Sequence, residues 1–258
     1  MSLDAPELPE KLPLKKRFRR ARRASRERFA ARRQRAFERS PKWLQNSLFR
    51  AYDYFDMIVI DHGIFRIFWT NRAQISGDIW RCNQPAPYQL GQMARRGIKT
   101  VLNLRGDREC GGFRLEKEAC DRLGLELVNF SLKSRAAPAK EILHEAKALF
   151  ETLEYPVLVH CKSGADRAGL ASVLFMHFKE GLPIERAIEQ LSPKFGHFKN
   201  SDTGIIDYVF ERYLQDNAAE PMEFMRWVDE VYDPDALEAE FKSGSLSNLL
   251  VNKILRRE

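Results

Sequence analysis

The stretch from Pro156 to Gly169 constrains this chain more than any other part of it. Val157 to His160 suit a buried strand of a parallel sheet, because such strands read as short, continuous apolar runs. A polar loop with a single cysteine, Cys161, comes next, and an apolar helical pattern then runs from Ala168 to about Lys179. The sequence therefore predicts a strand, a tight loop and a helix in direct succession.

A loop that enters a helix in this way is suited to binding an anion. Unpaired backbone N–H groups converge at the start of the helix, and the positive end of the helix dipole adds to their field. Cys161 lies at the start of the loop and is expected to react as a thiolate near neutral pH. Arg167 would add a planar guanidinium that can bind two phosphate oxygens. A nucleophile, a phosphate cradle and a positive clamp are thus predicted within one short loop.

His160 precedes the cysteine, and Gly169 follows the motif Cys161-x5-Arg167. This arrangement resembles the active-site loop of the cysteine-dependent protein tyrosine phosphatase superfamily. The resemblance covers roughly Ile75 to Leu214, and it is closest to the compact dual-specificity-like branch, some of whose members act on phospholipids. Two other interpretations of the loop are a packed thiol beside a surface arginine and a rhodanese-like sulfur carrier.

Alternating strand and helix patterns predict an α/β fold, with a mostly parallel central sheet flanked by helices on both faces. Strands are expected at residues 75–76, 79–81, 100–104, 126–130 and 157–160. Helices are expected at residues 87–96, 113–123, 139–153, 168–179, 183–192 and 202–214. The predicted organisation is a basic arm at 1–39, an amphipathic helical extension at 40–74, a catalytic domain at 75–215 and a helical tail at 216–258. Ligands of such sheets lie at the carboxyl ends of the strands, where Cys161 falls.

The resemblance implies a two-step hydrolysis that needs no metal and no cofactor. Cys161 would attack phosphorus in line and form a thiophosphate intermediate, which water then hydrolyses. Backbone N–H groups of the loop would bind the equatorial oxygens, which makes Lys162, Ser163, Gly164 and Ala165 substrate-binding residues. His160 would order the loop from behind.

The general acid departs from the pattern of the family. Much of the superfamily carries an aspartate in the stretch that corresponds to residues 131–138, which here contain no carboxylate. Asp166 is the first candidate, because some phosphoinositide phosphatases of the superfamily carry an aspartate at that position. Asp107 and Glu109 are the alternatives, and a structural partner of Arg167 is the other interpretation of Asp166. Ala168 replaces the usual serine or threonine, which predicts slow hydrolysis of the intermediate.

Lys133, Arg135 and Lys162 are predicted to lie around the pocket, although the first two could also point into water. Several cations near a phosphate site favour a polyanionic substrate, such as a phospholipid headgroup or an inositol phosphate, over a lone phosphotyrosine. Phosphorylated proteins stay open as substrates. The alternative function is a phosphate-binding pseudophosphatase or interaction module with little turnover.

The positive charge of the chain is concentrated in the arm. Residues 11–39 contain fourteen Lys and Arg against two Glu, a net of +12, so that the rest of a chain with total charge +7 sums to −5. Residues 15–39 lack Pro and Gly and suit a helix, with Phe18, Phe29 and Phe37 near one side. Three interpretations stay open: a solvated tail, a contact with an anionic membrane, and a contact with nucleic acid. No secretory signal is expected, whereas an organellar transit peptide would fit the arginines.

The extension begins with a helix start at Ser40 and Pro41. Apolar residues then recur at helical spacing, namely Trp43, Leu44, Leu48, Tyr52, Phe55 and Val59. Packing against the catalytic domain is predicted, and interfacial membrane contact is the alternative. Four irregularly spaced cysteines predict a reducing, cytoplasmic compartment. A membrane contact would place the protein peripherally on the inner face of a membrane.

Overall fold

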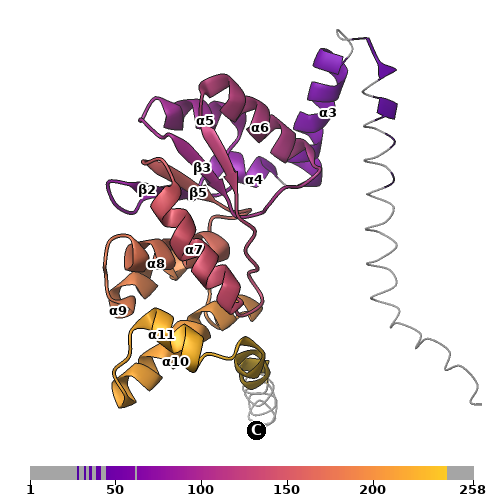
Figure 1. Ribbon diagram of the computed structural model, residues 1–258. Coiled ribbons are helices and arrows are strands. Elements are labelled where there is room, and N and C mark those ends of the chain that lie inside the picture. Colours follow the sequence, from indigo (N-terminus) through magenta and orange to yellow (C-terminus); the bar gives the residue numbers. More distant parts are fainter. Residues whose placement is uncertain are drawn as a thin grey trace, which may run out of the picture.

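The computed structural model describes residues 45–61 and 63–242, together with residues 28, 32, 35, 36 and 39–41. The predicted aromatic side of the arm and the end of the tail lie outside these residues. At the centre is a five-stranded sheet with the strand order β1-β2-β5-β3-β4 (Figure 1). The strands are β1 (Ala73–Gln74), β2 (Ile79–Cys82), β3 (Thr100–Asn103), β4 (Glu126–Asn129) and β5 (Val157–His160). Only β1 pairs antiparallel, so the predicted α/β fold with a mostly parallel sheet is confirmed.

The first strand was predicted two residues too late. β1 ends at Gln74, while the N–H groups of Ile75 and Ser76 both donate to the carbonyl of Ile79 and close the turn into β2. The other strands lie within a residue or so of their predicted bounds, because buried strands of a parallel sheet are continuous apolar runs.

Helices cover both faces of the sheet (Figure 1). They are α5 (Pro87–Ala94), α6 (Gly111–Leu123), α7 (Lys140–Thr152), α8 (Asp166–Phe178), α9 (Ile184–Ala187), α10 (Ile205–Ala219) and α11 (Phe224–Glu230). Side chains along a strand alternate between the faces. Leu158 accordingly packs with Leu90 of α5 and Cys120 of α6, whereas Val159 packs with the core that contains Leu143 of α7 and Leu170 of α8.

A helical extension precedes the sheet. It consists of a π-helical turn (Gln45–Phe49), α3 (Arg50–Phe55), a second π-helical turn (Asp56–Ile60) and α4 (Gly63–Phe68). The extension packs on the start of α6, where a Cβ atom at Gly111 would lie 2.5 Å from the carbonyl oxygen of Asp53. Glycine therefore permits the close contact.

The side of the extension that packs is different from the expected one. Met57 is buried against Ala86 and Leu115, but the predicted apolar residues Leu48, Phe55 and Val59 are exposed. Asp53, Asp56 and Asp61 of the extension make polar contacts with the domain. Within the described residues, no helix combines the length and the apolar character that a bilayer-spanning segment needs.

Candidate active site

The cysteine loop lies at the carboxyl end of β5, which β2 and β3 flank in the sheet. The backbone N–H of Gly164 donates to Cys161 Sγ over 3.2 Å, and α8 begins directly after the loop at Asp166. Gly164 has a φ of +74°, and a Cβ atom there would lie 2.6 Å from the backbone carbon of Cys82. Only glycine fits this turn without displacing β2, so the shape of the loop depends on Gly164.

The rear of the loop is held by Arg81 of β2, which the sequence analysis missed. Its side chain is fully buried, and its Nη2 donates to the carbonyls of Gly164 and Ala165 over 2.8 and 2.9 Å. Burial lowers the pKa of Arg81 to about 10. An arginine inside an otherwise apolar strand was the available signal, since a buried charge requires partners.

His160, the last residue of β5, is fully buried. Its Nδ1 lies 3.4 Å from the carbonyl oxygen of Cys161, and its Nε2 lies 2.5 Å from Oε1 of the equally buried Glu116 on α6. Gln84 donates to the other oxygen of Glu116 over 3.1 Å. A line of polar contacts thus connects the back of the loop to α6.

Three arginines lie close together beside the loop. Arg167 donates to the carbonyl of Leu104 over 3.3 Å, just after β3. Burial and the nearby positive charges of Arg105 and Arg167 lower the pKa of Arg108. Leu104, which follows β3, lies beside the loop because Asn103 is in register with His160 of β5. Arg105 and Arg108 were not among the cations predicted around the pocket.

Asp61 of the extension neutralises part of that charge. It binds Arg105 at 2.8 Å and Arg66 at 2.7 Å, and Lys162 of the loop lies 3.0 Å from its second oxygen. Burial raises the pKa of Asp61, but the hydrogen bonds and charges of Arg105 and Arg66 outweigh burial and hold the pKa well below its usual range. The extension is therefore tied to the loop by an ion network.

Asp166 is paired with His197 rather than with Arg167. His197 Nδ1 lies 2.8 Å from Asp166, and Nε2 lies 2.6 Å from Asp207 of α10, with the imidazole buried between the two carboxylates. Burial lowers the pKa of His197, but both carboxylates outweigh it and raise the pKa to about 9. Burial likewise raises the pKa of Asp166, yet hydrogen bonds from His197 and Thr203 outweigh it and leave the pKa below its usual value.

The remaining candidates are four exposed residues outside the loop and two residues within it. Lys133 is exposed, and Arg135 is exposed with Asp202 at 4.0 Å. Asp107 and Glu109 are exposed on the segment that follows β3. Within the loop, the hydroxyl of Ser163 accepts from the N–H of Ala165 over 3.4 Å, and Ala165 is buried.

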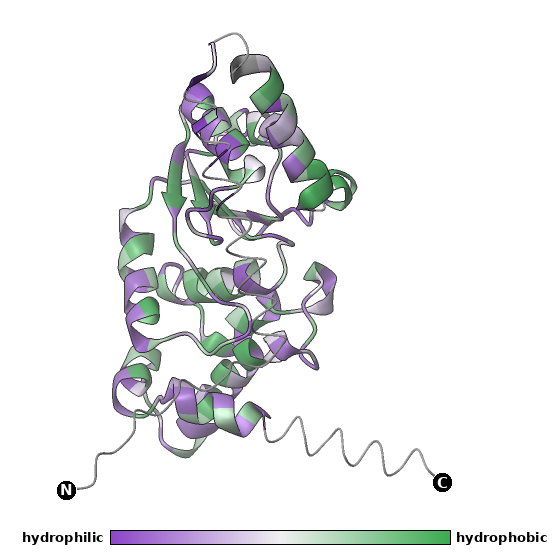
Figure 2. Cartoon of the chain, turned by 90° about the vertical axis from the view of Figure 1, so that its right-hand side faces the viewer, coloured by the Kyte–Doolittle hydropathy of each residue, from purple (hydrophilic) through white to green (hydrophobic). Residues whose placement is uncertain are grey.

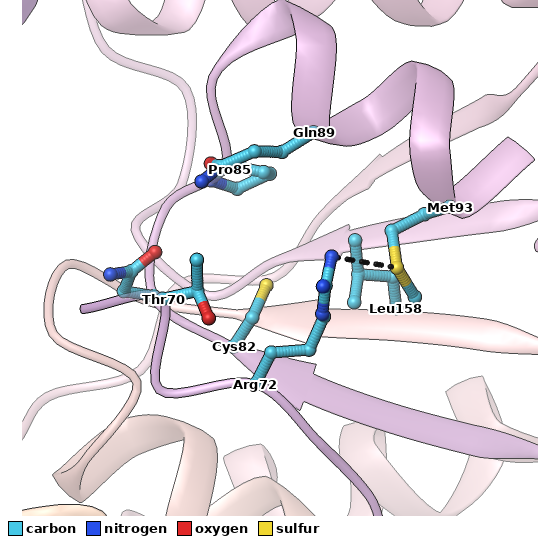
Figure 3. A pocket seen from close by; sticks show the side chains of 8 residues that line it. Thr70, Arg72, Cys82, Pro85, Gln89, Met93 and Leu158 are labelled. Carbon is cyan, nitrogen blue, oxygen red and sulfur yellow. Dashed lines mark hydrogen bonds between the residues drawn. The ribbon is translucent and has the colours of Figure 1, made fainter. Parts of the chain in front are cut away.

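A small pocket lies beside β2 (Figure 3). It is lined by Thr70, Arg72, Cys82, Asn83, Pro85, Gln89, Met93 and Leu158. Arg72 lies 3.6 Å from the sulfur of Met93 across it, as Figure 3 shows. The segment 161–167 contributes no lining residue to this pocket, although Cys82, which lines it, packs against Gly164 of the loop.

The strand β5, the cysteine loop with its arginine and the helix α8 follow one another in this sheet, which is the arrangement on which the resemblance to the dual-specificity-like phosphatases rests. Residues 70–192 match the family described as a dual-specificity phosphatase fused to NAD+ kinase. The chain is 26% identical over 104 residues to the inositol diphosphatase DSP4 of Arabidopsis thaliana, a match that covers 38% of this chain and 51% of that protein. The chain thus spans about half the length of this curated relative.

Solved structures give similar matches. TpbA of P. aeruginosa is 18% identical with a TM-score of 0.44, over 66% of this chain and 90% of that one. Human DUSP28 is 16% identical with a TM-score of 0.42, over 56% of this chain and 95% of that one. The family match and the curated relative confirm the resemblance to the dual-specificity-like branch.

Proposed function

We propose that this chain hydrolyses phosphate monoesters through a cysteinyl-phosphate intermediate, with Cys161 as the nucleophile. The observation that carries the proposal is the hydrogen bond from the N–H of Gly164 to Cys161 Sγ, in a loop that opens the 13-residue helix α8. The same donors and helix dipole that favour negative charge on sulfur favour it on phosphate oxygens.

In the first step, sulfur attacks phosphorus in line as the ester oxygen leaves. Backbone N–H groups of Lys162, Ser163, Gly164 and Ala165 hold the equatorial oxygens, together with the guanidinium of Arg167. In the second step, water attacks phosphorus and the thiolate leaves with its electron pair, which regenerates Cys161 and releases inorganic phosphate. His160 and Arg81 keep the loop in shape from behind.

Asp166 is the proposed donor of a proton to the leaving oxygen, with Asp107 and Glu109 as the alternatives. Its pKa lies below the usual value without substrate, and a nearby phosphate dianion raises it, because like charges disfavour ionisation. His197 would hold the carboxylate in place and return a proton to it. The buried methyl of Ala168 offers no hydroxyl to the leaving thiolate, so the second step is expected to be slow.

The proposed substrates are polyanionic, such as inositol phosphates or phospholipid headgroups at a membrane surface. Arg105, Arg108 and Lys162 add positive charge beside Arg167, beyond the charge that one phosphate needs. The name of the Arabidopsis relative, an inositol diphosphatase, agrees with this class. Phosphorylated proteins are the second class to be tested.

The experiment is release of inorganic phosphate from phosphotyrosine peptides, inositol phosphates and phospholipid vesicles, with Cys161→Ser as the control. We expect release from the polyanionic substrates and none with the variant, because an unactivated hydroxyl cannot replace a thiolate. Phosphate binding without release by the wild-type chain would support the pseudophosphatase alternative. A persulfide on Cys161 without phosphate release would support the sulfur carrier.

A further inference from the structure

The helical extension is built the opposite way round from an ordinary surface helix. Its acidic side chains face the domain, where Asp53 binds Arg114, Asp56 accepts from the N–H of Gly111 and Asp61 binds Arg105. Met57 is buried against the domain, but eight other large apolar side chains of the extension are exposed: Leu48, Phe55, Val59, Ile60, Ile64, Phe65, Phe68 and Trp69. We refer to these eight residues as the apolar face.

The apolar face is a concentrated feature. Elsewhere in the part of the chain that the structure describes, the exposed large apolar side chains are Tyr88, Phe198 and Val231. Phe68 is 85% exposed and Trp69 is 67% exposed, and the helical extension carries hydrophobic colour near the top of Figure 2. Groups of apolar side chains on a surface mark sites of interaction, whereas single ones do not.

The apolar face adjoins the candidate active site. Asp61 lies 3.0 Å from Lys162 of the loop, and the side-chain amide of Asn71 donates to the carbonyl of Ser163 over 3.0 Å. Phe65, Phe68 and Trp69 lie on the segment between these two contacts. Whatever covers this end of the apolar face is therefore held beside the phosphate-binding loop.

The residues before the extension are positively charged. Arg28, Arg32, Arg35 and Arg39 are helical and exposed, and their spacing of four, three and four residues places them on one side of a helix. Anionic headgroups complement such arginines, and the acyl boundary complements aromatic and branched apolar side chains. A bilayer offers both chemistries in one surface, with phosphate at the level of the headgroups.

We propose that the apolar face docks on the surface of an anionic phospholipid bilayer and holds the Cys161 loop at the headgroups. Docking rests on the exposed apolar side chains together with the exposed arginines before them, whereas hydrolysis of a phosphorylated lipid there rests on the proposed function. The aromatic residues sink below the headgroups, and the acidic contacts with α6 and the loop stay on the protein side.

The test is co-sedimentation of the full chain with vesicles of phosphatidylcholine, with and without phosphatidylglycerol. The two variants are Val59→Asp and Phe68→Ala, and the matched control is Val231→Asp, since Val59 and Val231 are 52% and 49% exposed. We expect binding to fall about tenfold for each variant on the apolar face, from the loss of one buried side chain. Val231→Asp should bind as the wild type does, and circular dichroism checks that each variant folds.

Three results would overturn docking. They are no sedimentation of the wild type, equal binding by Val59→Asp, Phe68→Ala and Val231→Asp, or a wild-type dimer that Val59→Asp dissociates without any vesicle binding. Phosphate release from a soluble ester, measured on the same samples, separates the two proposals. Vesicle binding without phosphate release would reject the proposed function and keep docking. Phosphate release without vesicle binding would keep the proposed function and reject docking.

Discussion

Asp166 has two possible roles at the start of α8, and the nature of the leaving group separates them. A proton donor matters most for alkyl phosphates, whose leaving oxygen is strongly basic. Asp166→Asn should therefore slow alkyl phosphates by about 10²–10⁴-fold and an activated aryl phosphate far less. Steady-state rates on both esters check this. Equal losses of rate on both esters would mean that Asp166 positions the loop. Asp107→Asn and Glu109→Gln would then be tested in the same way.

His197 makes the stability of the fold depend on pH on the alkaline side. Its pKa is about 9 in the folded chain and about 6.5 when unfolded. Because the folded value is the higher one, the stabilisation is complete below pH 6.5 and is lost as the pH rises through 9. His197→Gln should thus lower the free energy of unfolding by on the order of 2 kcal/mol near pH 6, with a much smaller difference near pH 10. Urea unfolding of the wild type and of His197→Gln at the two pH values measures this difference in the free energy of unfolding. A difference independent of pH would assign the loss to packing alone.

Which residues of the site could be predicted depends on how far apart in the sequence their partners lie. Cys161, Arg167 and the N–H donors lie in one loop, so the motif alone is enough to predict them as site residues. Arg81, Glu116 and His197 come from other elements, and only the fold brings them to the loop. Buried charge inside apolar patterns was the signal for Arg81 and Glu116. His197 lies in an irregular segment that carried no such pattern.

At the scale of elements, the sheet and its helices followed the local apolar periodicity, whereas the extension did not. Periodicity shows that a helix has an apolar side, but it does not show what that side packs against. In the extension, Asp53, Asp56 and Asp61 find basic or N–H partners on the domain, and these contacts leave the apolar side outward. The sequence contains these aspartates, but their partners lie on α6 and after β3, so the orientation could not be foreseen.

A variant at Asp61 tests how the extension affects the candidate active site. Asp61→Asn removes the charge that Arg66, Arg105 and Lys162 share, so those cations become available to a polyanionic substrate. KM for inositol phosphates should fall several-fold, while the melting temperature should drop, because buried arginines lose an ionic partner. The exposed Asp202, which lies 4.0 Å from Arg135, offers the control variant Asp202→Asn. An unchanged KM with a lowered melting temperature would limit Asp61 to a structural role.

The Asp61 network also predicts sensitivity to acid. The pKa of Asp61 is held below its unfolded value, so its stabilisation is present above about pH 4 and is lost as the pH falls further. The difference in unfolding free energy between the wild type and Asp61→Asn should accordingly shrink on acidification.

Over the whole molecule, charge is divided between two parts. Residues 11–39 carry a net of +12, from fourteen basic and two acidic residues, and the remainder of the chain sums to −5. An anionic surface therefore attracts one end of the chain and repels the rest. Each basic residue close to such a surface contributes about 1 kcal/mol, and salt screens the attraction beyond about 10 Å at 0.1 M ionic strength.

Deleting residues 1–39 removes this attraction without removing any residue of the proposed active site. Hydrolysis of a small soluble phosphate ester should stay unchanged, while binding to anionic vesicles should fall to the level set by the apolar face alone. Raising the salt concentration should weaken the binding of the full chain to anionic vesicles and leave the binding of the truncated chain nearly unchanged. Salt screens charge, and only the arm binds the vesicles through charge. Equal binding of both chains to anionic vesicles would refute a membrane role for the arm, and much tighter binding of the full chain to RNA or DNA would assign the arm to nucleic acid.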